Sequence, residues 1–481
     1  MNKFLLPLLC MIFILIAPSR GIADVRGTES PIISPMVNGE QRPCLDCHRR
    51  RNVNSNAGVL SSQTFCYECH AKSTCVRSVG EQKVSLEVKA DSFEKSRHKF
   101  VACIQCHTDV ARSPHTSQIG VQCLACHSVH GGSAAHSPHL RVRCEACHTD
   151  SQFVVLNRET DQIELAHVND KGAPISLAGH KRTDVNKDDF CRRCHQAQNT
   201  VGAAAAVLPP KSFLCLPCHY APLGMGHLMY WVGLLIFLFG AVLTVSFWFK
   251  GKVAGEEKSV HKKIALSSES IWSTIFSKEF FSLLKTFIFD VILQRRILQE
   301  SVKRWSIHSL IYLAFLGRLF LSVYTLIVFN IAPHSDQALA LINKNNGFTA
   351  FIYDLLGLFI IVGIVWAAVR RFIVKPPHVV SEEQDNIALV IIGILILSGF
   401  IVEGIRILIT QIPAHVAGYS FIGYLLAKLF SVIPLNWQVV YGYFWYFHAL
   451  MLILFIAYLP FGKLKHIFLT PLNLLLNRDM K

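Results

Sequence analysis

The sequence repeats the pattern Cys-x-x-Cys-His seven times between residues 44 and 219 of a 481-residue chain. The repeated thiols are Cys44, Cys47, Cys66, Cys69, Cys103, Cys106, Cys123, Cys126, Cys144, Cys147, Cys191, Cys194, Cys215 and Cys218. The histidines that follow them are His48, His70, His107, His127, His148, His195 and His219. This pentapeptide is typical of c-type haem attachment. Paired cysteines also bind zinc, but zinc does not explain a histidine after every second cysteine. The repeat predicts seven covalently bound c haems.

The spacing of the motifs limits the fold of this segment. They begin 20 to 47 residues apart, which leaves too little chain to build a separate core around each haem. We therefore expect the haems to pack against one another, with short helices and loops holding the motifs. Of the two cysteines outside the motifs, Cys75 is predicted to be a buried thiol.

The histidine count in this segment predicts the state of the irons. Residues 24–226 contain seven further histidines: His98, His115, His130, His136, His139, His167 and His180. One distal histidine for each haem gives bis-histidine ligation, although an exchange with His227 stays open. A six-coordinate iron relays electrons, whereas catalysis at a haem needs an open position. The sequence does not assign a distal histidine to a particular haem.

The amino terminus resembles an export signal. Lys3 precedes an apolar run at residues 4–17, and Gly21-Ile22-Ala23 provides small residues for cleavage. The run is too short to span a bilayer. Residues 1–23 are therefore predicted to be a signal peptide, which agrees with haem attachment outside the bacterial inner membrane.

The composition changes near residue 226. Five long apolar segments follow, at about 228–249, 306–330, 350–369, 387–410 and 438–460. Each is close to or longer than the roughly 20 residues needed to cross a bilayer. Buried helices of a soluble protein are a poor alternative for five such runs. We expect a mostly α fold, with a periplasmic seven-haem domain at 24–226 and a five-span membrane domain at 227–481.

Loop charges predict the orientation. Residues 250–304 hold eleven Lys and Arg, whereas loops 331–349 and 411–437 hold only Lys344 and Lys428. Basic loops stay cytoplasmic, so the carboxy terminus is predicted to be cytoplasmic and the haem domain periplasmic. Residues 271–293 are expected to form an amphipathic helix on the cytoplasmic face, and 419–433 a similar helix on the other face. Haem propionates offset the formal charge of +15, so a nucleic-acid partner is not expected.

Ionisable residues inside the apolar segments are candidates for function. His308 opens the second segment, His448 lies midway along the fifth, and His466 follows it. Histidine pairs on neighbouring helices are typical ligands of haem b. A packing histidine is the alternative for His308 and His448.

Residues 227–481 resemble the haem-b gamma subunit of respiratory nitrate reductase and, more closely, the membrane subunits of heterodisulfide reductase. The resemblance rests on five spans, the His448 and His466 spacing, the Pro-Phe-x-Lys-x-x-His ending at 460–466, Glu382-x-x-Asp385, and the segment 398–406. It implies that His308 and His466 bind one haem b. It also implies a second haem b between His448 and a histidine ten residues after His308, where this chain has Arg318. That leaves three alternatives: no second haem, another histidine such as His227, His334 or His415, or Arg318 on a propionate. We expect one or two b haems.

The predicted function is electron transfer from menaquinol through haem b to the c haems and a periplasmic acceptor, such as a c-type cytochrome. Glu403 and His448 are candidates for the quinol proton, with Arg318 nearby; an ion pair between Glu403 and Arg406 is the structural alternative. The expected partners are the quinone pool and membrane lipid, and a cytoplasmic iron–sulfur subunit is a further candidate. Inward transfer from a periplasmic donor is the main alternative. A terminal reductase would need a five-coordinate haem, and a haem store or sensor ranks last.

Overall fold

The computed structural model describes residues 56–79, 82–107, 123, 126, 137–148, 154–166, 191–251, 256–257, 259–333, 335–375 and 382–476. Contacts divide the chain into two compact units, Met1–Phe65 with Val101–Gln122 and Cys66–Phe100 with Cys123–Lys481. The predicted signal at 1–23 and the first motif, Cys44 to His48, lie outside the described residues. So do His115, His127, His130, His136, His167, His180 and His334.

The first unit contributes few described residues. They comprise the beginning of helix α3 (Asn56–His70) and the four-residue helix α5 (Cys103–Cys106), which carries both thiols of the third motif. The Gln63 side-chain amide donates a hydrogen bond to the Val101 carbonyl at 3.3 Å, which joins the two segments of this unit.

The described motifs of the second unit lie at short helical turns, as predicted. Helix α3 ends with the second motif, α6 (Cys144–His148) is the fifth, and the turn η3 (Phe213–Cys215) begins the seventh. The two other short helices are α4 (Ala90–Glu94) and η2 (Ser137–Arg141). Two antiparallel hairpins were not predicted: β1 (Val76–Val79) with β2 (Gln82–Ser85), and β3 (Val154–Asn157) with β4 (Gln162–Leu165). They are too short to give an extended alternating pattern in the sequence.

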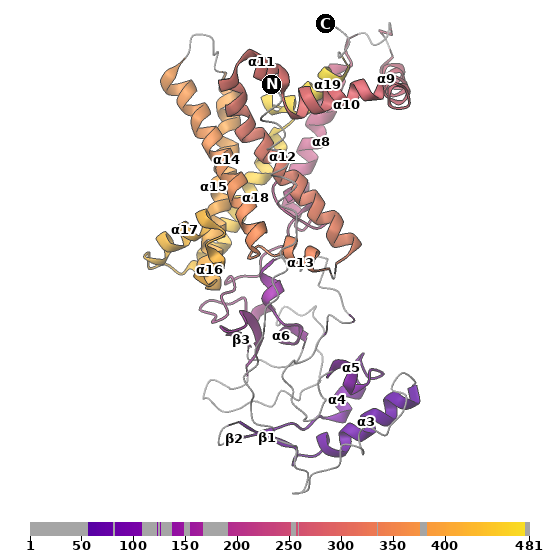
Figure 1. Cartoon of the computed structure of the whole chain (residues 1–481), viewed down its shortest axis with the longest axis vertical. Helices are drawn as coiled ribbons and strands as arrows, with labels where there is room; N and C mark the ends of the chain where they lie inside the picture. Colours follow the sequence, from indigo (N-terminus) through magenta and orange to yellow (C-terminus); the bar gives the residue numbers. More distant parts are fainter. Residues whose placement is uncertain are drawn as a thin grey trace, which may run out of the picture. The chain divides into compact units, whose positions relative to one another are not determined.

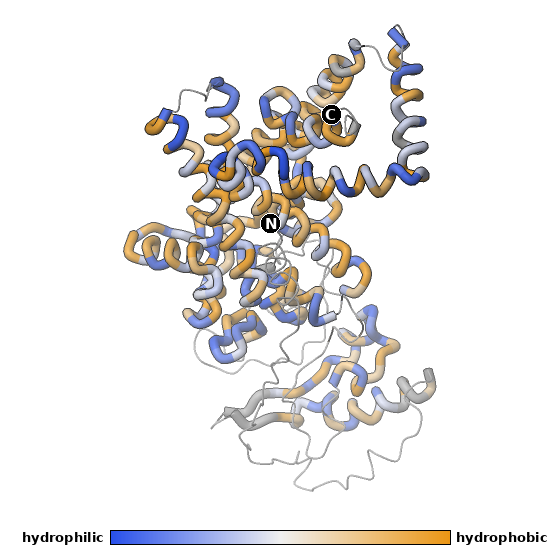
Figure 2. The backbone as a smooth tube through the Cα atoms, turned by 45° about the horizontal axis from the view of Figure 1, so that its top comes forward, coloured by the Kyte–Doolittle hydropathy of each residue, from blue (hydrophilic) through white to orange (hydrophobic). Residues whose placement is uncertain are grey.

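Five helices are long and apolar enough to cross a membrane, and they coincide with the five predicted segments (Figure 1). They are α8 (Leu228–Trp248), α12 (Val302–Ile331), α14 (Gly347–Ala368), α15 (Glu383–Thr410) and α18 (Trp437–Tyr458). Figure 2 shows hydrophobic colouring along these helices and more hydrophilic stretches near their ends. The chain is therefore mostly helical and has the features of a membrane protein.

Local signals define where these helices begin. Ser301, Asn346 and Asn436 each accept a backbone N–H of the first turn of α12, α14 and α18, respectively, which satisfies donors that a helix terminus otherwise leaves unpaired. Close helix packing then depends on small residues. A Cβ at Gly363 of α14 would lie 2.7 Å from the Ile311 side chain of α12, so the glycine allows the two helices to approach.

Shorter helices complete the second unit at the two ends of the bundle (Figure 1). They are α9 (Val260–Ile275), α10 (Phe280–Thr286), η4 (Phe287–Ile292), α11 (Arg295–Glu300), α13 (Asp336–Ile342), η5 (Val369–Val374), α16 (Ala414–Ala417), α17 (Phe421–Ser431), η6 (Lys463–Lys465) and α19 (His466–Leu476). The single amphipathic helix predicted at 271–293 is wrong: α9 ends at Ile275, and α10 begins only at Phe280. Ser277 closes this break by bonding the Thr274 carbonyl and the Glu279 amide, a local alternative to helix bonding.

The loop after the sixth motif packs on one end of the bundle. The Gln438 side chain of α18 donates to the Asn199 carbonyl at 2.8 Å, and the Ala205 amide donates to the Gln438 carbonyl at 3.0 Å. Arg141 reaches the carbonyl of Thr410, the last residue of α15, at 3.1 Å. The motif segment and the membrane helices are therefore joined by direct hydrogen bonds within one unit.

Candidate functional site

His308 of α12 and His466 at the start of α19 face each other, with ring centroids 6.2 Å apart and ring planes at 58°. The Nδ1 atom of His308 lies 3.0 Å from the side-chain oxygen of Gln294, and Nδ1 of His466 lies 2.7 Å from the Lys463 carbonyl. Both oxygens only accept hydrogen bonds, so each Nδ1 carries the proton. Each ring is left with an unprotonated Nε2 that can bind a metal.

This separation fits two axial ligands of one iron. A metal–imidazole bond of about 2.0 Å and about 1.1 Å from nitrogen to ring centre, on each side, place two coaxial rings about 6.2 Å apart. An acceptor that fixes the other ring nitrogen is the usual support of a metal-ligating histidine. The chemistry of the donor set therefore fits a haem iron between His308 and His466.

The two sequence motifs behind the resemblance meet beside this pair. Lys463 of the Pro-Phe-x-Lys-x-x-His ending lies 3.1 Å from a Glu382 carboxyl oxygen and 3.3 Å from an Asp385 carboxyl oxygen. Arg371 also lies 3.3 Å from Asp385. These ion pairs fix the turn whose carbonyl accepts from His466, so Glu382 and Asp385 position a histidine that they do not touch.

A second pair with the same separation lies in the motif segment. The ring centroids of His139 and His195 are 6.2 Å apart at 71°, and Nδ1 of His195 donates to the Ala204 carbonyl at 3.0 Å. His195 belongs to the sixth motif, and His139 is a predicted distal ligand 56 residues earlier. The structure thus brings together one motif histidine and one distal candidate that the sequence could not pair.

Other motifs show parts of the same arrangement. Nδ1 of His70 lies 3.0 Å from the Leu86 carbonyl, and Nδ1 of His219 lies 3.3 Å from the Tyr220 carbonyl. Cys75 is half-buried rather than fully buried, and its sulfur lies 3.7 Å from Nδ1 of His70. Burial, followed by the neighbouring Cys69, raises the pKa of the Cys75 thiol.

Successive motifs contact one another. The thiols of Cys123 in the fourth motif and Cys144 in the fifth are hydrogen bonded, and Arg193 inside the sixth motif donates to the Ala146 carbonyl inside the fifth at 3.4 Å. Within the described residues, no three His, Cys, Asp or Glu side chains converge as they would around a zinc ion.

The seventh motif is embedded in the membrane bundle. Leu214 and Cys215 are buried in a cluster that includes Tyr230 of α8 and Met451 of α18. Arg318, in the middle of α12, donates from Nε to the Cys218 carbonyl at 3.0 Å. Its guanidinium carbon also lies 5.4 Å from the centre of the Tyr353 ring. Arg318 therefore binds the backbone of a Cys-x-x-Cys-His motif.

His448 is held in the same way as the other histidines. Its Nδ1 atom lies 2.9 Å from the Ser398 hydroxyl, which itself donates to the Leu395 carbonyl at 3.0 Å. Because that hydroxyl proton is used, Ser398 accepts from Nδ1 of His448 and leaves Nε2 unprotonated. A Cβ at Gly399 would lie 3.4 Å from the His448 ring, so α15 packs directly against the imidazole.

Glu403 lies in a polar group at the same end of the bundle. It accepts from the Ser420 hydroxyl at 3.1 Å, and its carboxylate lies 3.7 Å from Arg406, so the predicted proximity on one helix face is observed. Asp354, 0% exposed, accepts the Ile422 amide at 2.8 Å. Arg406 also donates to the Asn345 side chain at 2.7 Å.

Cationic side chains gather around the seventh motif. Burial lowers the pKa of Lys211 to about 8, an effect that Cys215 opposes and Arg406 reinforces. Burial also lowers the pKa of His219 well below its usual range, and Lys211, Lys344 and His448 add to that shift. These groups are therefore within electrostatic reach of His219. Lys211 and Lys344 were not singled out in the sequence, because a lysine at a loop carries no motif.

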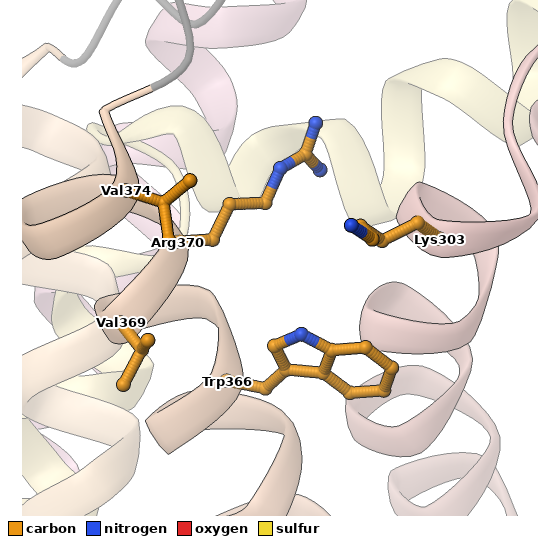
Figure 3. A pocket seen from close by; sticks show the side chains of 5 residues that line it. All are labelled: Lys303, Trp366, Val369, Arg370 and Val374. Carbon is orange, nitrogen blue, oxygen red and sulfur yellow. The ribbon is translucent and has the colours of Figure 1, made fainter.

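A hollow of about 190 Å³ lies away from these groups, between α12 and η5. Lys303 and Arg370 point toward each other across it, with the Trp366 indole below them (Figure 3). Basic and indole side chains are typical of the membrane–water interface.

Comparison with known proteins supports redox chemistry in a membrane. No family model matches the chain, and no solved structure matches it. Over 250 residues the chain is 27% identical to the EtfAB:quinone oxidoreductase of Syntrophomonas wolfei, which covers 50% of this chain and 31% of that protein. Over 257 residues it is 27% identical to one subunit of the dihydromethanophenazine:CoB–CoM heterodisulfide reductase of Methanosarcina barkeri, covering 51% of this chain and 89% of that subunit. The same subunit of Methanosarcina thermophila is 26% identical over 263 residues.

The chain thus spans about a third of the S. wolfei protein and most of the methanogen subunit. The similarity to heterodisulfide reductase that the residues indicated is confirmed. Together with five apolar helices, these relatives make the chain similar to membrane electron-transfer subunits of oxidoreductases.

Proposed function

We propose that this protein oxidises menaquinol in the bacterial inner membrane and passes the electrons to a periplasmic acceptor through one haem b and seven c haems. The observation that carries the proposal is the recurrence of one geometry. Two histidine pairs, each with ring centroids 6.2 Å apart, occur in a single compact unit, one in the membrane helices and one among the Cys-x-x-Cys-His motifs.

The residues divide the work between electron carriers and a proton acceptor. His308 and His466 would hold the haem b, and the motif thiols would hold the c haems. Haem iron with two imidazole ligands supplies one-electron transfer without an open site for substrate. Glu403 is the candidate that accepts a quinol proton, because its carboxylate lies beside Arg406 and Ser420 in a polar group at the motif-bearing end of the bundle.

Anaerobic reduction of the purified protein tests this function. A reduced menaquinone analogue is added in detergent while the c-haem α-bands are followed. The wild type and the exposed control His415→Ala should be reduced by the analogue. His308→Ala should remain oxidised with the analogue and still be reduced by dithionite. Wild-type c haems that stay oxidised with quinol but respond to dithionite would contradict quinol oxidation.

A second variant separates proton transfer from structure. Glu403→Gln keeps the size of the side chain and an oxygen for Ser420. If Glu403 accepts the proton, quinol-dependent reduction should fall by about 10²-fold or more, at unchanged haem content and melting temperature. A lower melting temperature with normal reduction kinetics would instead assign Glu403 to a structural ion pair with Arg406.

Inward electron transfer is the second candidate. The His308–His466 pair lies at the end of the bundle opposite the motifs, where a cytoplasmic partner could exchange electrons with it. The relatives are parts of reductases for other acceptors. Protein pre-reduced through its c haems should then reduce an added menaquinone analogue faster than the quinol reduces the oxidised protein.

A further inference from the structure

The seventh motif differs from the other described motifs in its surroundings. Cys215 is 6% exposed and packs with Leu214 against α8 and α18, whereas the other described motif cysteines are half-buried or exposed. The turn η3 contacts α18 directly. A haem attached to Cys215 and Cys218 would therefore lie against the membrane helices rather than among the preceding motifs.

The helix side of this contact contains an unpaired ligand. His448 presents Nε2 as a lone pair, because Nδ1 donates to Ser398. The position of α12 where the resemblance implies a partner histidine is Arg318, and a guanidinium does not bind iron. Arg318 instead donates to the backbone of the seventh motif at Cys218. The side chain that replaces a ligand thus holds the segment that carries His219, another ligand.

His219 and His448 approach each other from opposite elements. His448 acts electrostatically on His219, although the two lie 229 residues apart in the chain. His219 has Nδ1 toward the Tyr220 carbonyl, so its Nε2 is also available. Two imidazoles with free Nε2 atoms therefore lie close to the thiols of one haem attachment motif.

The surrounding charge calls for an anionic group. Lys344 is within electrostatic reach of Lys211, Arg406 and Arg318, and Glu403 is the acidic group that acts on it. Positive charges in a membrane interior are costly unless they are paired. The two propionates of a haem carry the charge that this cluster lacks, and Arg and Lys are suitable donors to them.

We propose that His448 is the distal axial ligand of the haem attached at Cys215 and Cys218, so that this c haem lies within the membrane helices and the chain binds a single haem b. The proposal rests on the haem cofactors of the proposed function but not on the direction of electron flow. A covalently attached haem takes the role that a second, non-covalent haem b would otherwise fill, and His308 with His466 hold the remaining haem b.

Haem content and spin state test the proposal. Pyridine haemochrome spectra of the wild type should give seven c haems for each b haem. In His448→Ala this ratio should not change, since the thioether bonds retain the seventh haem. Its iron should lose a ligand, so that one haem becomes high spin by electron paramagnetic resonance and binds carbon monoxide. His415→Ala should do neither, and His308→Ala should lose the b haem while all c haems stay low spin.

Two outcomes would overturn the proposal. Loss of a non-covalent haem from His448→Ala, with every c haem still low spin, would mean that His448 holds a second haem b. Unchanged haem content together with unchanged spin states would mean that His448 binds no iron. Should His448→Ala fail to fold, His448→Met keeps a large side chain and a ligand, and one low-spin signal should then shift to that of histidine–methionine ligation. These measurements need no quinol, so they are independent of the test of quinol oxidation.

Discussion

At the scale of single residues, the described histidines of the site share one support. Nδ1 donates to an oxygen acceptor: the Gln294 side chain for His308, the Ser398 hydroxyl for His448, and backbone carbonyls for His195 and His466. Such a partner fixes the tautomer and the ring orientation before any metal binds. A backbone carbonyl cannot be removed by mutation, so Gln294 and Ser398 are the positions where this support can be tested.

Replacing Gln294 should weaken binding of the proposed haem b. Gln294→Leu keeps the approximate size but removes the acceptor, and loss of such a partner typically costs about 10–100-fold in metal affinity or activity. Gln294→Glu keeps an acceptor and should retain the haem. The measurement is the b-to-c haem ratio after purification, with the melting temperature recorded for each variant. Equal ratios in both variants would show that Gln294 does not support His308.

The sequence identified the ligands at this scale better than their supports. His308, His448, His466 and Arg318 stand out because ionisable groups in apolar segments are costly. Gln294 does not, because its role comes from a left-handed backbone conformation, φ 54°, after a π-helical turn. Local patterns do not encode such a conformation for a glutamine. The contact of Arg318 with Cys218 joins residues 100 positions apart, which spacing alone cannot predict.

At the scale of elements, the five apolar helices were predicted closely because length and hydropathy alone define them. The break between α9 and α10 was not predicted, since serine hydroxyls ended a helix whose apolar pattern continues. The loop from His195 to Ala205 was also beyond sequence reasoning. It turns at Gly202, φ 74°, where a Cβ would contact the Ile409 carbonyl of α15.

Gly202→Ala should therefore destabilise the docking of this loop on the bundle. A non-glycine residue in the left-handed region costs about 1–3 kcal/mol, and the contact with Ile409 adds to that cost. Gly224→Ala is the matched control, because nothing lies within 4 Å of its Cβ position and its φ is not positive. Thermal unfolding in detergent should show a lower melting temperature for Gly202→Ala alone. Equal melting temperatures for the two variants would contradict a tight contact.

At the scale of the whole molecule, candidate sites follow one another through the second unit. The His308–His466 pair lies at one end of the bundle, the seventh motif lies within it, and the sixth motif is docked on the other end through Gln438. The fifth and fourth motifs then contact the sixth in turn. Sequence order alone gave the number of sites but not this succession, which arises from contacts between distant segments.

Removal of the sixth haem should interrupt the proposed route. In Cys191→Ala/Cys194→Ala, quinol should reduce only the haems on the membrane side of the gap, whereas dithionite should reduce all that remain. Cys66→Ala/Cys69→Ala removes a haem from the second motif and should leave the sixth and seventh haems reducible by quinol. The measurement is the fraction of the dithionite-reducible α-band that quinol also reduces. Complete reduction of the first variant by quinol would contradict a single route.

The position of Arg318, ten residues after His308 on α12, has a further consequence. Ten residues of helix rise about 15 Å, which is about half of a 30 Å hydrocarbon layer. An electron that moves from the haem held by His308 to the one beside Arg318 would cross about half of the membrane voltage, or about 1 kcal/mol per 100 mV. With a cytoplasm that is negative inside, this voltage favours outward movement and opposes inward movement. An energised membrane would then act on this protein as a rectifier, and respiration would lose part of the stored voltage with each electron released.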